Sequence, residues 1–143
     1  MPETLAFVDT NVLLYAASTD PAEADKRNQA RAVLNAGPFV FSVQVAQELF
    51  VNATKKLKPP LSGSDAVAFL KGINPRTVLA LDYELFEEAA RLHQRFKISY
   101  WDAAVVVAAK RLDSTTVYSE DLSDGQNDDG VRVINPFRLN FAR

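Results

Sequence analysis

The sequence predicts an α/β fold in which a mainly parallel sheet of about five strands carries helices on both faces. Two observations support this prediction. Short apolar stretches that suit buried strands alternate with longer stretches whose apolar residues recur at helical spacing. In addition, helices stand between most successive strands, and such crossover connections make the strands parallel and place the helices against the sheet.

The length of 143 residues suits one domain, and we expect residues 1–143 to form a single one. An apolar fraction of 48% is ordinary for a globular protein. No apolar stretch approaches the roughly 18 residues of a membrane-spanning helix, and residues 1–4 lack the basic start of a secretory signal. We therefore expect a soluble, cytoplasmic protein without a membrane partner.

The composition excludes several kinds of site. The chain has no cysteine, which rules out disulfides and thiolate metal ligands, and the single histidine, His93, argues against a zinc site built on imidazoles. Sixteen basic and eighteen acidic residues give a formal charge of −2, whereas a nucleic-acid-binding protein is often strongly basic. Any contact with nucleic acid must therefore depend on local basic patches or on bound metal.

The first predicted strand, residues 5–8, is apolar throughout and ends abruptly at Asp9. Thr10 and Asn11 then lead into a short helix over residues 12–17. A carboxylate therefore follows the carboxyl end of a central strand, where open α/β sheets bind ligands. Asp, Thr and Asn are also good helix N-caps, so Asp9 alone indicates no more than the start of a helix.

A second helix is expected over residues 22–35, with Ala30, Val33 and Leu34 towards the core. Three cations fall on its outer face, where they are either a solvated surface or a contact for phosphates: Lys26, Arg27 and Arg31. A Gly-Pro pair ends this helix, and residues 39–41 form the second strand.

The next predicted helix, residues 43–53, begins after Ser42 as N-cap. Helical spacing places Phe50 on its buried stripe, and Glu48 lies beside that stripe. A carboxylate at the margin of a buried face is either a surface charge or a ligand that points into a cleft. The proline-ended connector that follows is basic and could contact nucleic acid through Lys55, Lys56 and Lys58.

A helix over residues 62–72 and a strand over residues 77–81 come next. Asp82 is expected to cap a helix that reaches Phe96 and has His93 packed on its apolar face. The most apolar helix then covers residues 103–109, after Ser99 and Asp102, whose spacing resembles a capping box. The helix dipole favours a carboxylate at the position of Asp102, and the same arrangement would hold a catalytic carboxylate rigidly.

Two further strands are expected over residues 115–118 and 131–134. The first of them leads to Asp121, so that a carboxylate again follows a strand. Between the two strands, we expect residues 126–130 to be an exposed, mobile loop. This loop lacks the Asp and Gly spacing of a calcium-binding loop.

Four carboxylates thus lie near predicted strand ends or buried helices: Asp9, Glu48, Asp102 and Asp121. If they converge, they repel one another and raise one another's pKa. A fold keeps such a cluster when a hard divalent cation occupies it, and oxygen ligands suit Mg²⁺ or Mn²⁺. Such a site can serve the hydrolysis of phosphodiester bonds.

The four acids lie within four short motifs, at residues 7–13, 47–49, 100–104 and 118–122. In this order and spacing they resemble the motifs of the PIN-domain nucleases, and among these the VapC-type toxins of bacterial toxin–antitoxin pairs. The resemblance extends over essentially the whole chain and implies a single PIN-like domain.

The resemblance implies a metal-dependent endoribonuclease that cleaves RNA with Mg²⁺ or Mn²⁺, and it makes the four carboxylates both the catalytic residues and the metal ligands. Asn11 and Ser119 would be supporting polar residues that orient those carboxylates or a metal-bound water. Asp124 is a candidate outer ligand. The resemblance also implies a homodimer and a small protein antitoxin that blocks the site.

Two alternatives use the same residues. An Asp-nucleophile phosphohydrolase fits poorly, because haloacid-dehalogenase-like enzymes have a second Asp where this chain has Asn11, and receiver-like domains have an acid where it has Val8. A non-catalytic RNA- or protein-binding module on the same fold would be expected to have lost one or more of the four acids, and all four are present.

Overall fold

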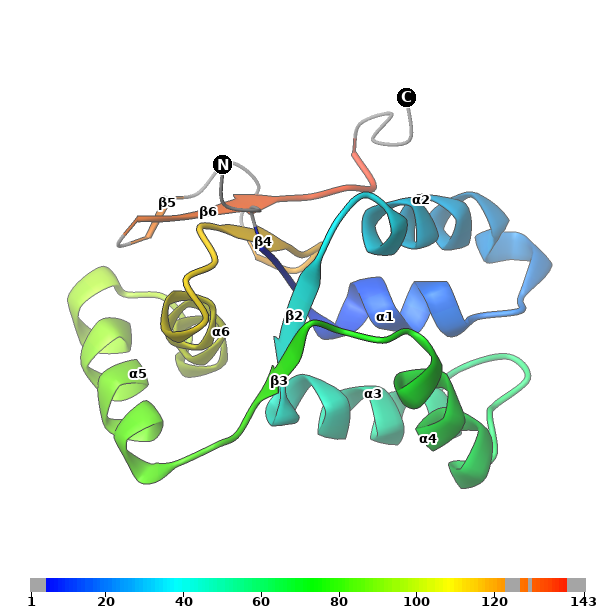
Figure 1. Cartoon of the computed structure of the whole chain (residues 1–143), viewed down its shortest axis with the longest axis horizontal. Coiled ribbons are helices and arrows are strands. Elements are labelled where there is room, and N and C mark those ends of the chain that lie inside the picture. Colours follow the sequence, from blue (N-terminus) through cyan, green and yellow to red (C-terminus); the bar gives the residue numbers. More distant parts are fainter. Residues whose placement is uncertain (1–4, 123–126, 129, 139–143) are drawn as a thin grey trace.

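The computed structural model describes residues 5–122, 127–128 and 130–138, which form a six-stranded sheet in the order β3-β2-β1-β4-β6-β5 (Figure 1). Neighbouring strands are parallel except β5 and β6. The predicted α/β class and mainly parallel sheet are therefore confirmed. In chain order the elements are β1 (Ala6–Val8), α1 (Thr10–Ala17), the 3₁₀ helix η1 (Pro21–Glu23), α2 (Ala24–Asn35), β2 (Phe39–Ser42), α3 (Val43–Lys55), α4 (Gly63–Gly72), β3 (Thr77–Leu79), α5 (Tyr83–Phe96), α6 (Tyr100–Arg111), β4 (Thr116–Tyr118), β5 (Asn127–Asp128) and β6 (Val131–Ile134).

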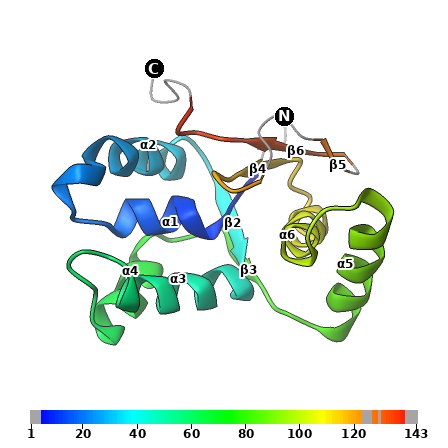
Figure 2. The ribbon, with the colours of Figure 1, turned by 180° about the vertical axis from the view of Figure 1, so that it is seen from behind.

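Helices cover both faces of the sheet. Helices α1 to α4 form one layer and α5 with α6 form the other, and the view from behind shows the same division (Figure 2). The central strands are apolar on both sides because both faces are covered; Phe7, Val40 and Val117 are completely buried. Helix α6 is also buried from Ala103 to Ala109, which confirms the prediction that it is central.

The order of the strands reverses at β1. Successive strands after β1 extend the sheet in one direction through β2 and β3, whereas β4 and β6 lie on its other side. Such a switch point leaves a crevice at the carboxyl ends of the strands. The backbone N–H of Asp9 donates to the carbonyl of Tyr118 (3.0 Å), so the ends of β1 and β4 lie next to each other.

Several local predictions were wrong. Residues 127 and 128 form strand β5 instead of a mobile loop, and Gly130 adopts the positive φ of 86° that suits a tight hairpin turn. Phe50 is 39% exposed instead of buried. His93 is exposed, and its Nδ1 contacts the carbonyl of Ile98, in the connection that follows α5.

The predicted outer ligand, Asp124, lies outside the described residues. Among the helices of the described ranges, none combines the length and the apolar character needed to span a bilayer.

Candidate functional site at the carboxyl ends of β1 and β4

Asp9 stands between the end of β1 and the first turn of α1. Because β1 is enclosed by both helical layers, the residue that follows it is also buried, and Asp9 is only 7% exposed. One carboxylate oxygen, Oδ1, accepts a hydrogen bond from the backbone N–H of Thr10 (2.8 Å). The other, Oδ2, accepts one from the hydroxyl of Ser119 (2.8 Å). Asp9 thus caps α1, as its residue type predicts, and also faces the end of β4.

The surroundings of Asp9 favour its protonated form. Burial raises the pKa of this carboxyl from its ordinary value of 3.8 to about 6, although hydrogen bonds from Ser119 and Thr10 act in the opposite direction. The negative charges of Glu48 and Asp121 raise the pKa further. An ionised Asp9 therefore lacks compensating positive charge, and a nearby cation would stabilise it.

Glu48 reaches the same region from the other side of the crevice. It lies on α3, which starts directly after β2, the strand beside β1. Its Oε2 accepts a hydrogen bond from the Thr10 hydroxyl (3.2 Å), and its Oε1 accepts one from the Gln44 amide (2.9 Å). Thr10 therefore contacts both acids, through its N–H to Asp9 and through its hydroxyl to Glu48. The sequence indicated Thr10 only as a cap residue, because its contact with Glu48 depends on tertiary packing.

The turn after β4 places Asp121 by means of Ser119 and Asn11. The Ser119 oxygen accepts from the backbone N–H groups of Asp121 (3.2 Å) and Leu122 (3.3 Å) and lies 3.4 Å from Asn11 Nδ2. Asn11 Oδ1 accepts from the backbone N–H of Glu120 (3.0 Å). The two residues predicted to support the carboxylates therefore hold the turn that carries one of them. Asp121 itself is exposed.

Thr10, Glu48 and Asp121 border a cavity of about 340 Å³, whose lining does not include Asp9 itself. It is lined by Thr10, Asn11, Leu14, Tyr15, Glu23, Glu48, Asn52, Lys56, Leu57 and Asp121. Three carboxylates and one lysine give the lining a negative formal charge. This cavity suits a cation better than an anion, and a polyanionic ligand would enter it only after that charge is compensated.

The structure changes the interpretation of Lys26, which was placed on the outer face of α2. Its ammonium forms an ion pair with Glu120 (2.7 Å to Oε2) and donates to the Tyr15 hydroxyl (3.1 Å). The Tyr15 hydroxyl donates in turn to Glu120 Oε1 (3.0 Å), and Lys26 Nζ lies 4.7 Å from the centre of the Tyr15 ring. Lys26 therefore ties α1 and α2 to the turn that carries Asp121.

Arg27 and Arg31 also bind within the molecule and are not simply solvated. Arg27 donates to the carbonyl of Ser18 (3.3 Å), and Arg31 donates to the carbonyl of Ala16 (3.2 Å). Both carbonyls lie at the carboxyl end of α1, where cations are favoured because the last carbonyls have no partner inside the helix.

Asp102 occupies the predicted position in the first turn of α6. Its backbone N–H donates to the Ser99 hydroxyl (3.0 Å), which confirms the predicted cap. Asp102 is half-buried and does not line the cavity beside Asp9, and its charge does not contribute to the raised pKa of Asp9. The charges of Glu48 and Asp121 both act on Asp9, and Asp102 remains a predicted member of the same site.

The donor atoms at this site fit a hard divalent cation. The converging side chains offer carboxylate, hydroxyl and amide oxygens, which Mg²⁺ and Mn²⁺ prefer over nitrogen and sulfur. Within the ranges that the structure describes, no three acidic or histidine side chains are close enough together to form a complete metal site. The chemistry of the ligands therefore fits, while the carboxylates would have to draw closer around a cation.

The family profile of the PIN domain matches residues 6–123. No curated protein matches the chain. Similar folds occur in Mycobacterium tuberculosis VapC20, described as a sarcin–ricin loop cleaving toxin (18% identity, TM-score 0.64, covering 81% of this chain and 89% of that one). A similar fold also occurs in a toxin–antitoxin complex from Klebsiella pneumoniae (20% identity, TM-score 0.67, covering 92% of this chain and 97% of that one). VapBC2 of Rickettsia felis bound to promoter DNA is a further example (13% identity, TM-score 0.62, covering 91% of this chain and 97% of that one). The TM-scores establish a common fold, and because the family profile covers most of the sequence, the chain belongs to the PIN domain family.

Proposed function

We propose that this protein is a metal-dependent endoribonuclease that acts as the toxin of a toxin–antitoxin pair. The observation that carries the proposal is the buried Asp9, with its raised pKa, beside Glu48 and Asp121 at the switch point of a PIN-domain sheet. Keeping such charges together costs free energy, which a bound cation offsets. Similar folds in proteins described as a toxin and as toxin–antitoxin complexes support the same proposal.

In this proposal the carboxylates that bind Mg²⁺ or Mn²⁺ are Asp9, Glu48, Asp102 and Asp121. A cation bound there would polarise the scissile phosphate and lower the pKa of the attacking water. The protein supplies the positioning. Thr10 holds the carboxylates of Asp9 and Glu48, and Ser119 with Asn11 holds the backbone of the turn that presents Asp121.

The proposed partners are an RNA substrate, a small protein antitoxin and a second copy of the chain, in the cytoplasm. Relatives in fold form toxin–antitoxin complexes, which supports an antitoxin partner. The surface near the start of α5 and α6 supports a protein interface. There Tyr83, Phe86 and Trp101 are 72%, 46% and 65% exposed, and exposed apolar patches of this kind mark contact sites.

A second candidate function is a non-catalytic binding module on the PIN fold. The observation that favours it is the incomplete arrangement of metal ligands among the described residues. This candidate predicts RNA or protein binding without cleavage under any metal condition, so a cleavage assay separates the two.

The test is cleavage of single-stranded RNA by the purified protein. We expect no cleavage in EDTA and recovery with Mg²⁺ or Mn²⁺, because without a cation the negative cavity repels the phosphodiester. The same preparation denatured by heat controls for contaminating nuclease. Cleavage that continues undiminished in EDTA would exclude the metal-dependent mechanism, and no cleavage with either metal would favour the binding module.

RNA contacts are a second prediction. Lys55, Lys56 and Lys58 are exposed, and Lys56 lines the negative cavity, so we expect them to attract the strand that enters it. Replacing all three by Gln should weaken RNA binding and flatten its salt dependence. Replacing Arg27 and Arg31 by Gln should leave the salt dependence unchanged, since both cations bind the end of α1. An unchanged salt dependence in the triple variant would place the RNA elsewhere.

A further inference from the structure

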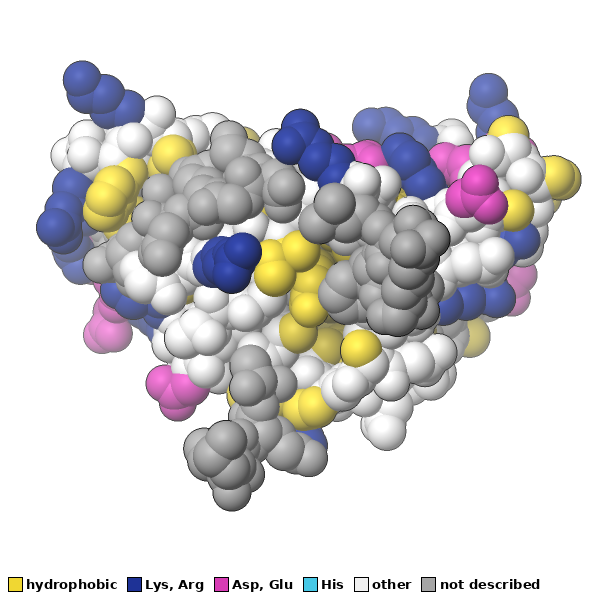
Figure 3. Space-filling model, turned by 90° about the horizontal axis from the view of Figure 1, so that it is seen from above, with side chains coloured by type: hydrophobic (Ala, Val, Ile, Leu, Met, Phe, Trp, Pro, Cys, Tyr) yellow, Lys and Arg dark blue, Asp and Glu magenta, His cyan; other side chains and the backbone are white. Residues whose placement is uncertain are grey.

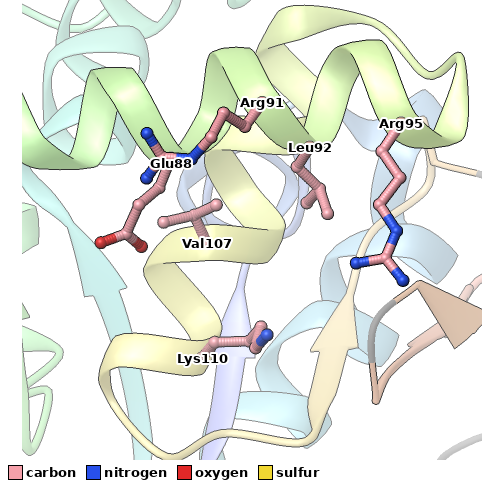
Figure 4. Close-up of a pocket in the computed structure, with 6 residues that line it drawn as sticks. All are labelled: Glu88, Arg91, Leu92, Arg95, Val107 and Lys110. Carbon is pink, nitrogen blue, oxygen red and sulfur yellow. The ribbon is translucent and has the colours of Figure 1, made fainter.

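A second cavity lies between α5 and α6, in the layer opposite to the one that contains Glu48. It has a volume of about 330 Å³ and is lined by Glu88, Arg91, Leu92, Arg95, Val107 and Lys110. Leu92 and Val107 are almost fully buried and belong to the faces through which the two helices pack. Figure 4 shows Lys110, from α6, pointing towards the side of the pocket on which Arg95 lies. We call this cavity the α5–α6 pocket.

The α5–α6 pocket is positively charged. Three cations and one carboxylate line it, and that carboxylate already has a partner. Glu88 Oε1 forms an ion pair with Arg111 Nη2 (3.1 Å), while Arg111 Nη1 pairs with Asp82 (2.9 Å). The negative charge of Glu88 is therefore drawn towards Arg111, so it compensates the cations of the pocket only in part.

Arg91 and Arg95 are the residues best placed to bind an external anion. Neither forms an ion pair or hydrogen bond within the described part of the chain. They are four residues apart on α5, so their side chains leave the same side of the helix about one turn apart. The Arg95 guanidinium lies 5.1 Å from the centre of the Phe96 ring, which limits its movement. Guanidinium groups bind phosphate through paired hydrogen bonds.

The charges elsewhere make this pocket stand out. The cavity beside Asp9 is negative, and all three α2 cations bind groups within the protein. On the face seen in Figure 3, basic side chains are scattered, and one of them lies beside the central hydrophobic group. An anionic ligand is therefore attracted to the α5–α6 layer more than to the cavity itself.

We propose that the α5–α6 pocket binds phosphate groups, and that these belong to the RNA strand at a distance from the cleaved bond. Arg91 and Arg95 would each hold a phosphate, and Leu92 with Val107 would form an apolar floor. The identity of the strand as RNA rests on the proposed function. The phosphate site itself does not, since it follows from the charge and shape of the pocket.

The test is binding of a fluorescent single-stranded RNA, in EDTA so that no cleavage occurs, measured by anisotropy over a range of salt concentrations. Each lost phosphate contact should lower the slope of log binding constant against log salt concentration by about 0.7. The variant R91Q/R95Q loses two contacts, so we expect it to bind about 25-fold more weakly at about 0.1 M salt than the unaltered protein. R91K/R95K keeps the charge and should retain most of the slope. R95Q and K71Q each remove one exposed cation and form the matched pair, and K71Q should behave as the unaltered protein.

A second measurement uses inorganic phosphate, followed through the NMR signals of the arginine Nε–H groups. Weaker RNA binding in R91Q/R95Q with a reduced slope supports the proposal, even if the protein cleaves no RNA with any metal and the proposed function fails. If R91Q/R95Q binds RNA as the unaltered protein does, but inorganic phosphate shifts the signals of Arg91 and Arg95, the RNA assignment is wrong. The pocket then binds a small phosphate ligand instead. If neither RNA binding nor the arginine signals respond, the proposal is wrong.

Discussion

Replacing Asp9 by Asn is expected to abolish RNA cleavage and, at the same time, to stabilise the metal-free protein at neutral pH. Loss of a metal ligand removes several kcal/mol of transition-state stabilisation, which corresponds to a decrease in rate of roughly a thousandfold. The gain in stability follows from burial. Asn resembles the neutral carboxylic acid in shape but needs no charge compensation.

The pH dependence of this gain follows from the pKa of Asp9. In the folded protein the pKa is about 6, above the ordinary 3.8, so the folded state holds the proton more tightly than the unfolded state. The unaltered protein therefore loses stability as the pH rises from about 4 to about 6, and it bears the full penalty above that range. At about 1.4 kcal/mol for each pKa unit, this penalty is about 3 kcal/mol.

Denaturant unfolding in EDTA, at neutral pH and near pH 4, measures the effect. Asp9→Asn should be more stable than the unaltered protein at neutral pH by up to about 3 kcal/mol and nearly equal to it near pH 4. Asp113→Asn removes an exposed carboxylate and should change neither value. A variant that is less stable at neutral pH would mean that Asp9 acts mainly as a helix cap.

Asp102→Asn is expected to abolish cleavage. The proposal makes Asp102 a metal ligand, so its loss should decrease the rate by a similar factor to the loss of Asp9. Unlike Asp9, Asp102 is only half-buried, and it is not among the charges that raise the pKa of Asp9. Loss of a carboxylate from the first turn of α6 should lower the free energy of unfolding by at least the helix-dipole contribution, roughly 0.3–1 kcal/mol.

The experiment compares Asp102→Asn with Asp121→Asn in the same cleavage and unfolding assays. Asp121 is exposed and lines the cavity, so Asp121→Asn should lose cleavage while keeping nearly the stability of the unaltered protein. Asp102→Asn should lose cleavage as well. Full activity of Asp102→Asn would remove this residue from the site. A large loss of stability would instead identify it as a structural residue of α6.

Predictions that depend on local sequence agree well with the structure. The apolar stretch that precedes Asp9 and the β-prone stretch that precedes Ser119 form neighbouring parallel strands. The hydroxyl of Ser42 and the carboxylate of Asp82 cap the helices that follow them. These features depend on residues that are close in sequence, whose propensities and cap hydrogen bonds are known.

Predictions that depend on distant partners were less successful. Lys26 was assigned to the solvent because helical spacing places it away from the buried stripe, yet it pairs with Glu120, 94 residues further along the chain. Thr10 and Glu48 are 38 residues apart, and only the packing of α3 beside α1 brings them together. Helical periodicity identifies which side of a helix is apolar, but it does not identify the partner that a polar side chain reaches.

The central claim is that Asp9, Glu48 and Asp121 belong to one divalent-cation site. Titration of the protein with Mn²⁺, followed by electron paramagnetic resonance without RNA, tests this claim most directly. We expect Mn²⁺ to bind saturably, with an affinity that is strongly weakened in Asp9→Asn and Glu48→Gln and unchanged in Asp113→Asn. Equal binding by the protein and all three variants, or no binding by a protein that nevertheless cleaves RNA in EDTA, would contradict it.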